Sequence, residues 1–218
     1  MIEEPVAVES PLAAINRDAG QHTVPSDPEE LALALRAAAR AWQMFPYLHL
    51  RFGERGERFT HSDSCWLVTL NSRPTAEALA ELDWLRRVLV PRGLPTMLLE
   101  AHLRLIQAEF ALLSRPATPG AQGYDAFLRR GDAERARWNP AVVGGAVDRA
   151  DAALRRTTGL HVPSAAALVA SAWEDERSGI AGGLAATRTW FTDGGRFSPE
   201  WIHTVQDLVA ALDAIEFA

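Results

Sequence analysis

Hydrophobic residues recur every three or four positions along most of this chain. Between residues 28 and 50 the apolar side chains fall at Leu31, Leu35, Ala38, Trp42 and Phe45. An α-helix has 3.6 residues per turn, so this spacing places the five side chains on one face that can be buried. No stretch shows the sustained alternation of apolar and polar residues that is typical of a strand. The pattern predicts an all-α fold, with helices over residues 28–50, 61–71, 74–91, 95–114, 140–157, 163–177, 180–192 and 198–216.

Prolines and glycines mark the ends of these predicted helices. A proline suits the first helical turn, because its missing N–H would be unpaired there anyway and its φ is already helical. Six prolines stand at such starts: Pro28, Pro74, Pro95, Pro140, Pro163 and Pro199. Gly53, Gly93 and Gly159 stand where an apolar stripe ends, as expected for residues that adopt positive φ beyond a helix. The chain should therefore contain about seven or eight helices.

The predicted helix over residues 95–114 is apolar around most of its circumference. Its large apolar residues are Leu98, Leu99, Leu103, Leu105, Ile106, Phe110, Leu112 and Leu113. Such a helix needs neighbours on several sides. A chain of 218 residues is also long enough to bury one sizeable core. We expect a single compact bundle over residues 26–218 around this central helix, preceded by a loosely ordered tail over residues 1–25.

Two segments are rich in glycine, proline or charge and lack a clear apolar period. Residues 51–60 alternate arginine and glutamate around two glycines, which favours a solvated loop. Residues 115–139 surround only a short apolar segment, so we expect a mobile connection there that could serve as a lid.

Composition and charge exclude several classes of function. The formal net charge of −6 lacks the basic face that a nucleic-acid-binding protein needs. All 22 basic residues are arginine, so a Walker-type phosphate loop or a Schiff base, which need lysine, is excluded. The N-terminus has no signal-peptide pattern, and no apolar run approaches the roughly 18 residues of a membrane span. With a single cysteine and no internal disulfide, we expect a cytoplasmic protein without a membrane partner.

The segment from Arg51 to Trp66 holds the most distinctive group of polar residues. Arg51, Arg55 and Arg58 could together hold a carboxylate or phosphate near His61 and Asp63, because guanidinium groups match such anions in geometry. The alternative is that these side chains are solvated and that Asp63 or a nearby hydroxyl caps the following helix. Cys65, close to His61, could be a nucleophile, but a lone cysteine beside Trp66 is more often a small buried hydrophobe.

His102 lies on the apolar central helix, with aliphatic residues one turn away on either side. Its imidazole should point inside, where a buried polar ring needs a partner. That partner is either a protein group in a well-packed core or a bound ligand, such as a tetrapyrrole iron.

No complete catalytic motif occurs in the sequence. We therefore expect a non-catalytic helical regulatory or binding protein that holds a small ligand or docks on a partner protein. Its ligand-binding candidates are His102, Arg51, Arg55, Arg58, His61 and Asp63. The alternative is an enzyme, or a haem-binding sensor of globin-like helical type, that uses His102 or the cluster of His61, Asp63 and Cys65. The sequence specifies neither a cofactor nor an oligomeric state.

Overall fold

Helices account for almost all of the regular structure. The computed structural model describes residues 15–16, 23–113 and 118–216, and within these ranges it holds nine α-helices and three short 3-10 turns but no strand. The predicted all-α bundle is confirmed. The helices are α2 (Pro28–Met44), α3 (Pro46–Thr69), α4 (Thr75–Leu89), α5 (Thr96–Leu112), α6 (Pro119–Arg135), α7 (Pro140–Leu154), α8 (Ala165–Arg177), α9 (Gly183–Phe191) and α10 (Pro199–Asp213). The 3-10 turns are η1 (Leu70–Ser72), η2 (Val90–Arg92) and η3 (Ala136–Trp138).

Several helices begin at the prolines and capping residues that the sequence marks. The Asp27 carboxylate accepts from the backbone N–H of Glu29 at the start of α2, and Pro28 follows in the first turn. Ser198 caps α10 in the same way, ahead of Pro199. These side chains satisfy N–H groups that have no partner within the first helical turn.

The region from residue 45 to residue 60 differs from the prediction. The expected helix over residues 28–50 ends at Met44, because Pro46 restricts the residue before it, and Phe45 has a non-helical φ of −123°. The expected loop over residues 51–60 is wrong: α3 continues to Thr69 with a kink at Gly53, whose φ is 56°. Glutamate and arginine are good helix formers, and that preference outweighs the two glycines.

The expected mobile connection over residues 115–139 is also wrong for its described part, because residues 119–135 form α6. Its glycines serve close packing. Gly120 lies so near the backbone of η1 that an added Cβ would stand 2.0 Å from the Leu70 carbonyl oxygen. The buried Tyr124 hydroxyl donates to the Leu67 carbonyl at 2.7 Å. Residues 114–117 lie outside the described residues.

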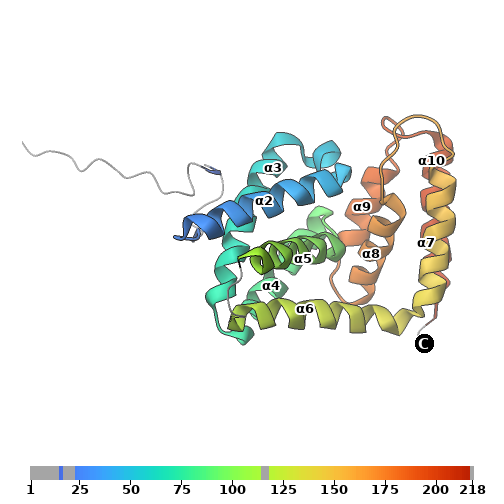
Figure 1. Cartoon of the computed structure of the whole chain (residues 1–218). Coiled ribbons are helices and arrows are strands. Elements are labelled where there is room, and N and C mark those ends of the chain that lie inside the picture. Colours follow the sequence, from blue (N-terminus) through green and yellow to red (C-terminus); the bar gives the residue numbers. More distant parts are fainter. Residues whose placement is uncertain (1–14, 17–22, 114–117, 217–218) are drawn as a thin grey trace, which may run out of the picture.

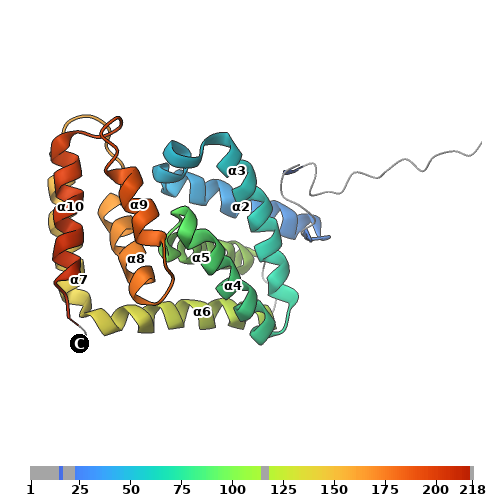
Figure 2. The same ribbon diagram turned by 180° about the vertical axis from the view of Figure 1, so that it is seen from behind.

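The interior contains two groups of buried apolar side chains. The N-terminal core lies between α2, α3, α4, α5 and α6, and the C-terminal core lies between α7, α8, α9, α10 and the start of α3, which contributes Tyr47 and Leu48. Figures 1 and 2 show α7 and α10 side by side at one end of the molecule, with α8 and α9 between them and the other helices. The predicted central helix, α5, contributes to both cores, through Leu98 to one and Leu103 to the other.

Residues 1–14 and 17–22 of the predicted tail lie outside the described residues. Asn16, which is described, is buried, and its side-chain amide donates to the Ser62 hydroxyl at 3.2 Å. This part of the tail therefore lies against α3.

Candidate functional site

The three arginines of the distinctive segment do not converge on one anion. Arg55 and Arg58 are exposed on α3, and the guanidinium of Arg55 lies over the Phe59 ring at 5.5 Å. Arg51 lies before the kink and points away toward η2. It donates to the Tyr47 hydroxyl at 2.5 Å and, more weakly, to the Arg92 carbonyl at 3.3 Å. The kink at Gly53 separates Arg51 from the other two.

Arg51 and Tyr47 hold the start of α3 against the turn before α5. The Tyr47 hydroxyl donates to the Gly93 carbonyl at 2.5 Å. Gly93 has a φ of 81°, and a Cβ there would stand 2.2 Å from the Arg51 guanidinium. A glycine at this position therefore serves two purposes: it allows the left-handed backbone and it leaves room for Arg51.

In the group of His61, Asp63 and Cys65, the cysteine is fully buried and the other two residues are half-buried. Burial raises the pKa of the Asp63 carboxyl to about 6, and the Arg92 guanidinium opposes this rise. Cys65 is fully buried, and burial raises the pKa of its thiol to about 11. A thiol with that pKa stays protonated near neutral pH and is a poor nucleophile. Within the described ranges, no three His, Cys, Asp or Glu side chains are grouped so that they could hold a metal ion.

His102 is buried on α5, as its position in the apolar pattern predicts. Its Nε2 atom lies 2.7 Å from the Ser64 hydroxyl oxygen on α3, which is a hydrogen-bonding distance. Burial, with a smaller contribution from His61, lowers the pKa of His102 to about 4, so the ring is neutral at physiological pH. His102 lines neither of the two concavities described below. Its role as a ligand contact stays a prediction, and its geometry is that of a core histidine with a protein partner.

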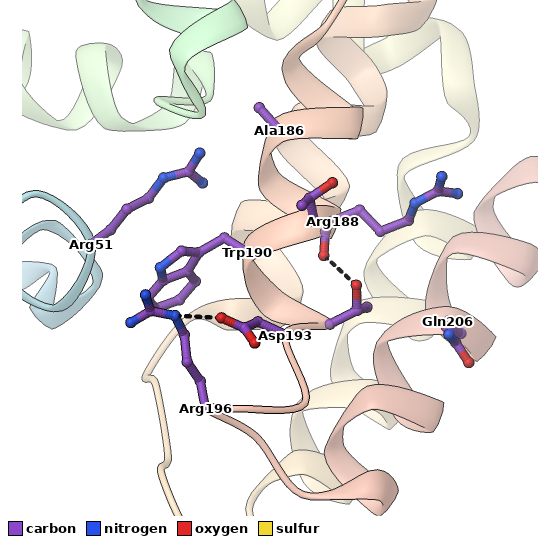
Figure 3. A pocket seen from close by; sticks show the side chains of 9 residues that line it. Arg51, Ala186, Arg188, Trp190, Asp193, Arg196 and Gln206 are labelled. Carbon is purple, nitrogen blue, oxygen red and sulfur yellow. Dashed lines mark hydrogen bonds and ion pairs between the residues drawn. The ribbon is translucent and has the colours of Figure 1, made fainter.

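An open concavity of about 720 Å³ lies over the outer face of α9 (Figure 3). We call it the α9 groove. Arg51 of α3 borders one side, Gln206 of α10 borders another, and α9 with the turn that follows it forms the floor. Its lining residues are Arg51, Ala186, Arg188, Thr189, Trp190, Thr192, Asp193, Arg196 and Gln206.

Close packing at the start of α9 fixes the position of this groove. A Cβ on Gly183 would stand 2.5 Å from the Val90 side chain, so only a glycine lets α9 approach η2 this closely. At the other end of α9, Trp190 packs edge-on against Tyr47, with ring centroids 5.1 Å apart. Trp190 makes a similar contact with Phe197, at 5.3 Å. These aromatic contacts join α3 to α9 and hold Trp190 rigidly at the groove.

The turn after α9 presents Arg196. The Asp193 carboxylate accepts from the backbone N–H of Gly195 at 2.9 Å and from Arg196 Nε at 2.8 Å. The backbone hydrogen bond, followed by Arg196, lowers the pKa of the Asp193 carboxyl. The Arg196 guanidinium also lies 5.9 Å from the centre of the Trp190 ring, a distance typical of a cation–π contact. Arg196 is thus preorganised in the groove.

The charges in the groove do not balance. It contains three guanidinium groups and one carboxylate, that of Asp193, which pairs with Arg196. Among the described residues, Arg51 donates to uncharged oxygen atoms only. Arg188 is exposed, and its guanidinium forms no ion pair with any residue in the described part of the chain. Within the part of the chain that the structure describes, two positive charges of the groove therefore have no carboxylate partner, on a protein whose net charge is −6.

A second polar group is enclosed where α4, α5, α6 and α8 meet. Asp175 accepts from Arg86 at 3.1 Å and from the backbone N–H of Thr96 at 2.9 Å, while Arg135 donates to Glu100 at 2.8 Å. We call this group, with Glu134 and Glu174, the ionic centre. The space inside it is only about 10 Å³, roughly the minimum for one water molecule. It is therefore a cross-link between helices and has no room for a ligand.

Sequence reasoning identified Arg51 but missed Arg188 and Arg196. Arg188 lies on a short helix and Arg196 lies in a turn, and no local spacing connects them with Arg51. Comparison with protein families, with curated proteins and with solved structures gave no match to this chain. No helix in the described ranges is both long enough and apolar enough to cross a membrane.

Proposed function

We propose that this chain is a non-catalytic helical binding protein that holds an anionic ligand in the α9 groove. The observation that carries the proposal is the placement of Arg51, Arg188 and Arg196, from three parts of the chain, around one concavity with a single carboxylate. Like charges that gather without a counter-charge repel one another, so an anion in the groove would be stabilised. Guanidinium groups also form paired hydrogen bonds with carboxylate or phosphate oxygens.

The placement of the reactive side chains supports a binding role over catalysis. Cys65 is fully buried, with a thiol that stays protonated, and the imidazole of His102 is hydrogen-bonded to Ser64. The α9 groove itself offers arginine, threonine, glutamine and tryptophan side chains, and its single carboxylate is paired. These groups suit recognition of charge and shape, because none of them is a poised nucleophile or base.

Calorimetric titration of the whole chain with pyrophosphate and with a hexaglutamate peptide tests this proposal. At least one of these anions should bind at low salt and bind more weakly at high salt, where charges are screened. Arg188→Gln or Arg196→Gln should weaken that binding about tenfold or more, since a hydrogen bond between charged groups contributes about 1.5–3 kcal/mol.

Arg129→Gln is the matched control, because Arg129 is an exposed arginine on α6, outside the groove. It removes the same charge from the protein as Arg188→Gln and should leave the affinity nearly unchanged. If neither anion binds, or if neither groove variant weakens binding more than Arg129→Gln does, the proposal is wrong.

A further inference from the structure

The arginines of the α9 groove face different directions. Figure 3 shows Arg51 and Arg196 on one side of α9, with Trp190 between them, whereas Arg188 projects from the other side toward α10. One small anion cannot contact both sides of the helix at once. An occupant that uses all three guanidinium groups must carry at least two separated negative charges and lie across α9.

The open form of the groove also argues against a small ligand. Sites for small molecules usually enclose most of the ligand surface. Here Arg188, Thr189, Arg196 and Gln206 are all exposed, so a small molecule lying among them would remain largely in water. A groove of this form fits a segment of a larger molecule, whose other parts cover the rim.

The composition of the groove matches the centre of a protein–protein contact. Tryptophan and arginine are the residue types that most often dominate binding energy at such contacts. Trp190 is half-buried and held by its aromatic neighbours, so little side-chain entropy remains to be lost on binding. The threonine hydroxyls and the Gln206 amide at the edge can form hydrogen bonds with the backbone of a bound peptide.

From these observations we infer that the occupant of the α9 groove is an acidic segment of a partner protein, extended across α9. This inference rests on the proposed function and narrows the anion to carboxylates carried on a polypeptide. Charge complementarity supports it, because Arg51 and Arg188 lack carboxylate partners within the described ranges. A nucleic acid fits less well, since its closely spaced phosphates would meet an acidic protein whose groove has two arginines without a carboxylate partner among the described residues.

The test compares four probes at equal ionic strength: a hexaglutamate peptide, a hexaglutamine peptide, pyrophosphate and a short oligothymidylate. Hexaglutamate should bind most tightly, and hexaglutamine should not bind. Arg188→Gln and Arg196→Gln should each weaken hexaglutamate binding roughly fivefold or more, and the double variant should lose approximately the product of the two factors. Multiplied effects are expected because the two arginines meet different carboxylates.

Two further variants keep the result interpretable. Arg196→Lys retains the charge but loses the planar fork, so its affinity should lie between those of the wild type and Arg196→Gln. Arg129→Gln should bind hexaglutamate like the wild type. Thermal melting of every variant shows whether the fold is retained, and an exposed arginine should tolerate these changes.

The outcomes separate this inference from the proposed function. If pyrophosphate binds as tightly as hexaglutamate, and only one of the two arginines matters, the groove is a small-anion site and this inference is overturned while the proposed function stands. If the oligothymidylate binds most tightly, the partner is a nucleic acid and the inference is overturned. If no anion binds, both the inference and the proposed function are wrong.

Discussion

Ser64 and His102 form a buried polar pair between α3 and α5. Both side chains are buried, and their neighbours along the chain include the fully buried Cys65 and Leu103. A buried polar atom without a partner costs more free energy than the net contribution of an ordinary hydrogen bond. The hydrogen bond between the two side chains therefore offsets the free-energy cost of burying each of them.

Replacing Ser64 by alanine tests this dependence. Ser64→Ala leaves the Nε2 atom of His102 without its partner, and the free energy of unfolding should fall by about 1–3 kcal/mol. Urea unfolding followed by circular dichroism measures the change. Ser72→Ala removes an exposed hydroxyl and should change the stability by less than about 0.5 kcal/mol. Equal stability of the Ser64 variant and the wild type would contradict the pairing.

Among the helices, α6 shows most clearly that a glycine can be needed for close packing between elements. Its sequence suggests a flexible connection, yet Gly120 lies against the backbone of η1 and Gly123 lies against Ala78 of α4. By contrast, Gly144 of α7 has no atom within 4 Å of the position where a Cβ would be. The same residue type thus permits close approach of helices in one case and only weakens a helix in the other.

Substituting alanine at these two glycines should have opposite effects. Gly120→Ala forces the backbone of α6 away from the Leu70 carbonyl and should lower the free energy of unfolding by roughly 1–3 kcal/mol. Gly144→Ala should raise it by up to about 1 kcal/mol, because alanine favours the helix and meets no obstacle. Thermal melting of the two variants gives the comparison. Destabilisation of equal size by both would show that α6 does not depend on close approach at Gly120.

Local sequence patterns predict the helices themselves, but they do not predict how distant helices pack together. Apolar period and capping residues are local, so the all-α class, the central α5 and the starts of α2 and α10 were predictable. The packing of α6 depends on a distant surface, η1, which no local pattern describes. The α9 groove has the same origin, since Arg51 meets α9 only because Tyr47 and Trp190 pack together.

For the whole molecule, the important feature is that the two cores meet through polar contacts as well as apolar ones. The ionic centre connects Arg86 of α4, Glu100 of α5 and Arg135 of α6 with Glu174 and Asp175 of α8. The start of α3 adds an apolar link to this junction, because Tyr47 and Leu48 belong to the C-terminal core and the later part of α3 belongs to the N-terminal core. Arg51 reaches the α9 groove through that packing.

The protonation of Glu174 should make the stability of this junction depend on pH. Burial, together with the carboxylates of Asp175 and Glu100, raises the pKa of Glu174 from 4.5 to about 7, although Arg135 and Arg86 oppose the rise. Between those two values the folded chain holds a proton that the unfolded chain has lost. This contribution to stability is fully present below pH 4.5 and disappears as the pH rises through 7.

Glu174→Gln removes this titration and keeps the size of the side chain. As the pH rises from 5 to 8, the stability of the variant relative to the wild type should increase by about 1–2 kcal/mol, because Glu174 is partly exposed and its charge is partly screened. His102, whose pKa is lowered from 6.5 to about 4, acts in the opposite direction, because its contribution is lost as the pH falls below 6.5. Since both proteins contain His102, its effect cancels in the difference between them. Urea unfolding of both proteins at pH 5 and pH 8 measures that difference, and a value that is the same at both pH values would show that Glu174 does not titrate with folding.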